Sequence, residues 1–88
     1  MKVYQVVLTL EAQSDLRNTE SSIRARLLDK LDWIGENAEL IQHQALQGDE
    51  WKGCFKYRIG DYRIIYKMEH STAKVTVLKV GHWREVYK

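Results

Sequence analysis

Two alternating runs on either side of Gly60-Asp61 constrain the fold of this 88-residue chain more than any other feature. Aromatic and aliphatic residues alternate with basic ones through positions 55–59, and a similar alternation follows the dipeptide at positions 62–67. Side chains of a strand point to opposite faces in turn, and Gly-Asp between two such runs is typical of a two-residue β-hairpin turn. The cross-strand pairs predicted from this turn are Ile59 with Tyr62, Arg58 with Arg63, Tyr57 with Ile64 and Lys56 with Ile65.

The predicted hairpin has one apolar face and one basic face. The apolar face, which is expected to pack on helices, consists of Phe55, Tyr57, Ile59, Tyr62, Ile64 and Tyr66. The other face presents Lys56, Arg58, Arg63, Ile65 and Lys67. Like charges directly opposite each other destabilise a sheet by about 0.2–1 kcal/mol, so folding alone does not explain the facing arginines. A bound phosphate would reverse the sign, because guanidinium groups bind phosphate oxygens through charge-assisted hydrogen bonds. The alternatives are a solvated basic face, or pairing with Glu69 or Glu85.

The segments around the hairpin predict one strand and two helices before it and one strand after it. Lys2 to Thr9 is rich in β-branched and aromatic residues, and Thr9 can cap a first helix that ends near residues 18–19. In that helix Ala12 and Leu16 share one face. Ser21 or Ser22 can cap a second helix that ends at residues 35–37, and its apolar stripe consists of Ile23, Leu27, Leu31 and Ile34.

The order of these elements gives an α+β fold class. Residues 38–49 form an irregular connection, and a last strand covers Lys74 to Val80. We therefore expect an N-terminal strand, a two-helix hairpin and then a three-stranded antiparallel β-meander, all in one sheet and in a single domain spanning residues 1–88.

Charge and cysteine content narrow the function classes. Residues 51–88 carry nine basic and three acidic side chains, a net +6, whereas residues 1–50 carry five basic and nine acidic, a net −4. This asymmetry indicates a polyanion partner for the second half, or else a solvated mixed surface. Cys54 is the one cysteine, and the N-terminus shows neither a signal peptide nor an apolar span, so we expect a cytoplasmic protein without membrane contact. Cys54 and the histidines lack metal-ligand spacing and no phosphate loop is present, so neither metal nor cofactor is expected.

Two segments resemble the RelE/ParE toxin family. The first runs from Lys52 to Tyr66 and includes Gly-Asp-Tyr-Arg-Ile-Ile-Tyr at positions 60–66; the second is Gly-His-x-x-x-Val-Tyr at positions 81–87. The resemblance covers the whole chain and is closest to the RelE branch. It implies the RelE-like microbial RNase fold and the toxin of a type II toxin–antitoxin system. It also implies an mRNA interferase, a metal-independent endoribonuclease that cleaves mRNA in the ribosomal decoding site and is held inactive by a cognate antitoxin.

The resemblance also implies which residues act. Lys56, Arg58 and Arg63 match the family's basic sheet residues, and Tyr87 matches its C-terminal functional tyrosine. The arginines suit stabilisation of the transition state, Lys56 could stabilise charge or move a proton, and Tyr87 could act as general base or stack on a nucleobase. Alternatively, the Tyr87 ring packs on the sheet edge. His82 is a secondary acid–base candidate. The candidates for RNA binding are Lys52, Lys67, Trp83 and Arg84.

One position departs from the family pattern. Trp83 follows the Gly-His pair where many members have arginine, and strand alternation would point Arg84 away from the site. Trp83 could stack on a nucleobase or close the core. Two other functions therefore stay open: a non-catalytic, gyrase-directed toxin of the ParE branch, and a degenerate member that only binds RNA or antitoxin.

Overall fold

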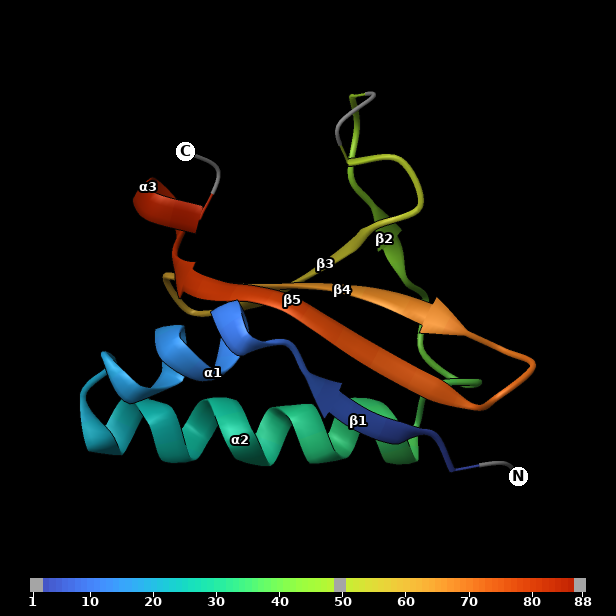
Figure 1. The fold of residues 1–88 in the computed structure, drawn as a ribbon, viewed down its shortest axis with the longest axis horizontal. Helices are drawn as coiled ribbons and strands as arrows, with labels where there is room; N and C mark the ends of the chain where they lie inside the picture. Colours follow the sequence, from blue (N-terminus) through green and yellow to red (C-terminus); the bar gives the residue numbers. More distant parts are fainter. Residues whose placement is uncertain (1–2, 49–50, 87–88) are drawn as a thin grey trace.

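The computed structural model describes residues 3–48 and 51–86. Its elements are β1 (Gln5–Leu8), α1 (Leu10–Arg17), α2 (Ser21–Glu36), β2 (Gln44–Ala45), β3 (Phe55–Ile59), β4 (Tyr62–Glu69), β5 (Lys74–His82) and α3 (Trp83–Val86). The strands form one sheet in the order β1-β5-β4-β3-β2. Helices α1 and α2 lie on one side of this sheet, whereas α3 and the described parts of the β2–β3 connection lie on the other (Figure 1). Within the described ranges, no helix has the length and apolarity needed to cross a bilayer.

The predicted α+β architecture is confirmed, with three additions. Strands β3, β4 and β5 form the expected antiparallel meander, and β1 is the expected N-terminal strand. The first addition is the parallel pairing of β1 with β5, and the second is the short β2, which pairs with β3 within the segment expected to be irregular. The third addition is α3, a single turn after β5.

The hairpin has the predicted register. Ile59 lies opposite Tyr62 and Arg58 opposite Arg63, and the pairing continues along both strands as expected. Gly60 has a φ of 56°, a left-handed conformation that glycine adopts without a steric penalty. Asp61 is not among the residues with positive φ, so the turn matches type II′, in which only the first central residue needs positive φ.

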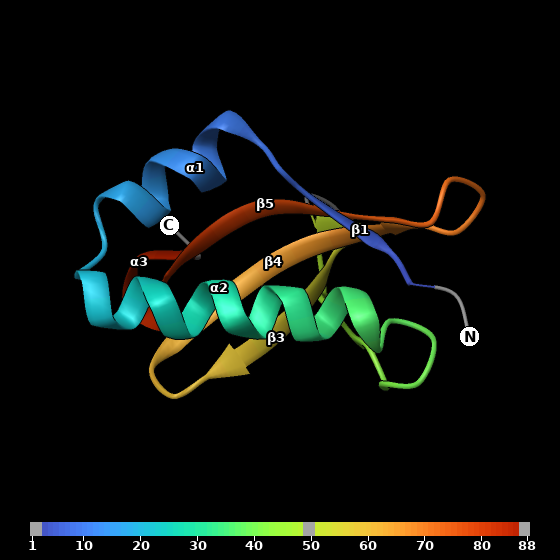
Figure 2. The same cartoon turned by 90° about the horizontal axis from the view of Figure 1, so that it is seen from below.

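The main core lies between the helices and the sheet. Leu27, Leu31 and Ile34 of the predicted α2 stripe are buried, while Ile23 is half-buried against the same cluster. Seen from below, α2 runs across this face of the sheet (Figure 2). The close packing extends to the end of α2, where a Cβ on Gly35 would lie 2.7 Å from the carbonyl oxygen of Tyr4. Only glycine allows β1 and α2 to approach so closely.

The Tyr66 hydroxyl is a hydrogen-bonded polar group within the main core. Tyr66 is fully buried, and its hydroxyl lies 2.6 Å from Nδ1 of His43. The other ring nitrogen of His43, Nε2, is 2.7 Å from the carbonyl oxygen of Ala38. Because a carbonyl can only accept, Nε2 donates, and in neutral His43 the Nδ1 atom accepts the Tyr66 hydroxyl proton. Burial, and secondly the nearby Tyr57, raise the pKa of Tyr66 to about 12.

The helix caps were predicted correctly at one helix and wrongly at the other. The Thr9 side chain accepts a hydrogen bond from the N–H of Ala12 at 3.2 Å and caps α1 as expected. In α2, Ser21 is already the first helical residue and Glu20 is the N-cap, without a side-chain cap hydrogen bond. Ser22 instead donates to the Glu20 carboxylate at 2.8 Å. The predicted serine cap is therefore wrong, because the chain enters this helix one residue earlier than the serines.

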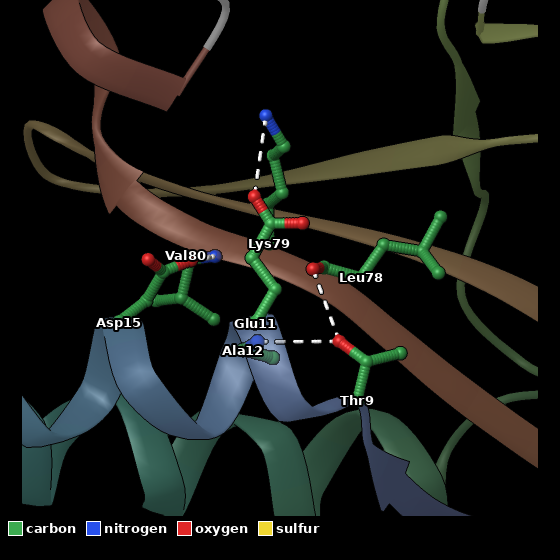
Figure 3. A network of polar contacts seen from close by, with 7 residues as sticks. All are labelled: Thr9, Glu11, Ala12, Asp15, Leu78, Lys79 and Val80. Atoms are coloured by element: carbon green, nitrogen blue, oxygen red, sulfur yellow. Dashed lines mark hydrogen bonds and ion pairs between the residues drawn. The ribbon is translucent and has the colours of Figure 1, made fainter.

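Helix α1 covers the part of β5 that β1 leaves unpaired. Strand β1 pairs only with residues 74–77 of β5. Beyond them, the Thr9 hydroxyl donates to the Leu78 carbonyl at 3.2 Å, and the Val80 N–H donates to the Asp15 carboxylate at 3.0 Å (Figure 3). Lys79 forms an ion pair with Glu11 at 3.5 Å. These contacts satisfy strand-edge groups that would otherwise be open to another chain.

A β-bulge in β5 lets both faces of the sheet pack. Ile65 lies opposite Lys79, but the next residue of β4, Tyr66, lies opposite Val77, so Leu78 is the extra residue. Val77 and Val80 are both buried in the main core, whereas Leu78 packs on the other side of the sheet. Strict alternation would not allow Val77 and Val80 to share a face.

Candidate functional site

The face of the sheet away from α1 and α2, called the outer face from here on, carries the predicted basic residues. Arg58 of β3 lies opposite Arg63 of β4, and Arg63 in turn lies opposite Gly81 of β5. Lys56 lies opposite Ile65, two residues along from the arginine pair. The structure thus brings Lys56, Arg58 and Arg63 together, and the side chain of Val86 lies over Gly81, where a Cβ would be 3.8 Å from it.

Both guanidinium groups turn toward the same carbonyl of the hairpin turn. Arg63 donates from Nη1 to the Gly60 oxygen at 3.1 Å and to the Tyr62 oxygen at 3.0 Å. Arg58 Nε lies 3.4 Å from the same Gly60 oxygen, which makes this hydrogen bond the weakest of the three. Two positive charges therefore converge on one neutral acceptor at an exposed turn, and an anion there would meet donors from both strands.

No acidic side chain of the described residues forms an ion pair with either arginine. The one ion pair within residues 3–48 and 51–86 joins Lys79 of β5 to Glu11 of α1. Glu69 accepts a hydrogen bond from Thr72 rather than from an arginine. In the described part of the chain, the alternative in which Arg63 pairs with Glu69 or Glu85 is therefore not supported.

A small apolar cluster anchors the segments that surround the outer face. Cys54, Ile65 and Val86 are buried in it, and Leu46, Trp51 and Leu78 pack against them. Val86 belongs to α3, while Leu46, Trp51 and Cys54 belong to the β2–β3 connection. The cluster thus fixes both segments on the same side of the sheet as the basic residues, as Figure 1 shows for their backbones.

His82 does not join the basic residues. It lies opposite Tyr62, with ring centroids 5.8 Å apart, on the face that packs against the helices. Its Nδ1 accepts a hydrogen bond from the N–H of Arg84 at 3.2 Å. Lys52 and Lys67 are both exposed, Lys52 before β3 and Lys67 on β4. Tyr87 lies outside the described residues.

Helix α3 corrects two expectations about the segment after His82. Trp83 is 44% exposed, so it does not close the core. Arg84 belongs to a helical turn rather than to a strand, so strand alternation does not set its direction. The Arg84 guanidinium lies 5.3 Å from the Trp83 ring centroid. The ring of His82, the residue before Trp83, stacks on the same indole with its centroid 6.0 Å away. The backbone N–H of Trp83 donates to the backbone carbonyl oxygen of Asp61 at 2.8 Å. This hydrogen bond places a cation and two aromatic rings beside the hairpin turn.

Two of the cavities beside the hairpin differ in their lining. One, of about 230 Å³, is lined by Gln42, Gln44, Lys56, Tyr57 and Arg58. The other, of about 250 Å³, lies between α2 and the turn and is lined by Ile23, Arg26, Leu27, Ile59, Gly60, Asp61 and Tyr62. Only the first contains members of the basic group. No sequence pattern marks Gln42 and Gln44 as site residues, because only the pairing of β2 with β3 brings them to this place.

The described residues do not bring three or more His, Cys, Asp or Glu side chains together as a metal site would require. The chemistry available on the outer face is therefore that of fixed cations, amides and aromatic rings. Such groups bind anions and unpaired bases, and they stabilise negative charge that develops during a reaction.

Comparisons with known proteins identify a matching family model and similar folds. A family model for the ParE toxin of type II toxin–antitoxin systems, parDE, matches residues 6–87. The chain is similar to the toxin–antitoxin complex RelBE2 of Mycobacterium tuberculosis, with a TM-score of 0.82 and 25% identity over 93% of each chain. It is also similar to the isolated Escherichia coli RelE toxin, with a TM-score of 0.73 and 25% identity over 90% of this chain and 83% of that one.

An archaeal RelE–RelB complex from Pyrococcus horikoshii shares the fold, with a TM-score of 0.75 and 20% identity over 96% of this chain and 99% of that one. A search of curated protein sequences found no match.

Proposed function

The chain belongs to the ParE toxin family of type II toxin–antitoxin systems, within the RelE/ParE superfamily, and we propose that it is a ribosome-dependent mRNA endonuclease. The observation that carries this proposal is the arrangement of Arg58 and Arg63, whose guanidinium groups converge on the Gly60 carbonyl. No acidic partner among the described residues offsets them. A phosphate of the mRNA, presented in the decoding site, would take the position between these cations.

The proposed reaction is attack of an RNA 2′-OH on the adjacent phosphate. The 2′ oxygen forms a bond to phosphorus, the bond to the 5′ oxygen of the next nucleotide breaks, and the products are a 2′,3′-cyclic phosphate and a 5′-OH. One proton leaves the 2′-OH and one is delivered to the departing oxygen. Negative charge accumulates on the phosphorane in between, so the largest contribution expected of the protein is electrostatic stabilisation of that charge.

The roles follow from the chemistry of each side chain. Arg58 and Arg63 hold the phosphate and stabilise the phosphorane, because paired guanidinium donors match its oxygens. Lys56, on the same face, adds a third cation and can deliver a proton to the leaving oxygen. Tyr87 is proposed as the proton acceptor. His82 is the weaker candidate because its ring contacts Tyr62 on the helix-packed face.

We also propose Lys52, Lys67, Trp83 and Arg84 as RNA-binding residues. The two lysines are exposed, and Trp83 offers an indole for stacking on a base. Arg84, which lies over that indole, would add a phosphate contact.

The partner proposed for the resting protein is a cognate antitoxin. The M. tuberculosis and P. horikoshii relatives are described as toxin–antitoxin and RelE–RelB complexes. An acidic or amphipathic antitoxin segment that folds onto this chain would offset the charge of residues 51–88 and would compete with RNA. Such binding would also stabilise a domain of this size considerably.

A second candidate function is inhibition of DNA gyrase without catalysis. It is favoured by the family description, which names ParE, and by Trp83 at a position where many mRNA-cleaving members have arginine. Adding the purified protein to a translation reaction and to a gyrase supercoiling reaction separates the two. Cleavage of translated mRNA with unaffected supercoiling supports the endonuclease. Inhibited supercoiling with intact mRNA supports the alternative and removes the proposal.

A further inference from the structure

The cavity of about 230 Å³ beside the basic residues lies at an incomplete edge of the sheet. Strand β2 pairs with β3 only through Gln44 with Lys56 and Ala45 with Phe55. Among the described residues, no further strand lies beside the rest of β3, beyond Lys56, on that side. The cavity occupies this edge, with Gln42 and Gln44 on one side and β3 side chains on the other.

The lining suits a planar polar ring. Two carboxamides, those of Gln42 and Gln44, each offer a donor and an acceptor, and neither makes a side-chain hydrogen bond within residues 3–48 and 51–86. Carboxamides recognise the edges of nucleobases through such donor–acceptor pairs. Tyr57 adds an aromatic ring to the same lining, and the volume is below the roughly 300–1,000 Å³ of pockets that hold drug-sized ligands.

The Tyr57 ring packs against residues of α2. Its centroid lies 6.2 Å from that of Trp33, and the Lys30 ammonium lies 5.6 Å from it. Lys30 also lies 4.5 Å from the Trp33 centroid. A ring fixed in this way is a ready stacking surface, because little side-chain freedom is lost when a base packs on it.

The cavity is continuous with the proposed phosphate position. Lys56 and Arg58 belong to both the cavity lining and the basic outer face, and Arg58 lies directly opposite Arg63. The five residues that line the cavity include no acidic side chain that would repel a phosphodiester. A nucleotide whose base enters between the glutamines and β3 therefore has its phosphate directed toward the two arginines.

We propose that this cavity is a nucleobase subsite, in which Gln42 and Gln44 read the hydrogen-bonding edge of one unstacked RNA base and Tyr57 stacks on it. The base belongs to a nucleotide next to the phosphate held by Arg58 and Arg63. This inference rests on the proposed function and deepens it, since it makes the subsite a source of the toxin's sequence preference.

The first test compares cleavage patterns. Wild type, the double variant Gln42→Ala/Gln44→Ala and the control Gln5→Ala, an exposed glutamine on the opposite edge strand β1, are each added to translation of an mRNA pool whose cut sites are sequenced. The double variant is expected to lose about 5- to 100-fold of the preference for one base beside the cut, while Gln5→Ala keeps it. An unchanged preference in the double variant overturns the inference and leaves the endonuclease proposal standing.

The second test does not depend on cleavage. Short single-stranded RNAs with 2′-O-methyl groups, which cannot attack the phosphate, are titrated into the wild-type protein while amide and ring resonances are followed by NMR. In the wild type we expect shifts of the Gln42 and Gln44 side-chain amides and of the Tyr57 ring, and the Tyr57 shift should be lost in the double variant. If these shifts occur without any cleavage of translated mRNA, the subsite holds and the endonuclease proposal fails. If the RNA binds without affecting these groups, the subsite is wrong.

Discussion

Replacing Arg63 with alanine is expected to separate stability from activity. The substitution removes two hydrogen bonds, to the oxygens of Gly60 and Tyr62, but Gly60 is exposed and its carbonyl can turn to water instead. It also removes the like charge opposite Arg58, and this relief of repulsion should raise the free energy of unfolding by about 0.2–1 kcal/mol. The free energy of unfolding should therefore change by less than about 1 kcal/mol, or about 4–8 °C in Tm.

Cleavage should fall far more than stability. Loss of a donor that stabilises a transition-state anion lowers a rate by about 100- to 1,000-fold, or about 2.7–4 kcal/mol. Thermal unfolding and the rate of ribosome-dependent mRNA cleavage are measured for Arg63→Ala and for Arg17→Ala, an exposed arginine at the end of α1 that should change neither strongly. A large drop in Tm would make Arg63 a structural residue. Undiminished cleavage with a normal Tm would remove it from the active site.

Three further predictions concern the fold. The pKa of Tyr66 rises from 10.0 in the unfolded chain to about 12 in the folded protein. The stability that comes from its un-ionised hydroxyl is therefore intact below pH 10 and is lost as the pH rises toward 12. Urea unfolding should show about 2–3 kcal/mol less stability over that window, and Tyr66→Phe should remove this part of the pH dependence. Asp15→Ala should lower the free energy of unfolding by about 1–3 kcal/mol in the same assay, because it leaves the Val80 N–H of β5 without its acceptor. Asp15→Asn, which keeps an acceptor oxygen, should recover most of that stability. Gly35→Ala should lower the free energy of unfolding, measured by thermal unfolding, by about 1–3 kcal/mol, because its Cβ would lie 2.7 Å from a backbone oxygen. The control Gly81→Ala should be tolerated, because its Cβ would lie 3.8 Å from its nearest neighbour.

Local patterns predicted the parts of the fold that local chemistry determines. The Gly60-Asp61 turn set the hairpin register, the α2 stripe followed from helical spacing, and Thr9 capped α1 as expected. The pairing of β1 with β5 and of β2 with β3 joins distant segments, and β2 has only two residues, so no periodicity could reveal it. The α2 cap was wrong because serine can serve equally well at a cap or in the first turn of a helix.

The candidate site was predicted in the same uneven way. The facing arginines were visible because hairpin register follows from a turn of known length. The placement of His82 opposite Tyr62 depends on the bulge in β5, which the sequence does not signal. Trp83 and Arg84 lie on a helical turn whose last residue, Val86, is held by packing on the outer face. Such long-range packing is absent from any local pattern.

The most direct test of the central claim is the chemistry of the ends that the wild-type protein leaves on mRNA. A defined mRNA is translated with the purified protein, cuts are mapped by primer extension, and the fragment ends are identified by phosphatase and ligase sensitivity. Cleavage only when ribosomes are present, with a 2′,3′-cyclic phosphate upstream and a 5′-OH downstream, is the predicted result. Fragments with a 3′-OH and a 5′-phosphate, or no cleavage of translated mRNA at all, would contradict it.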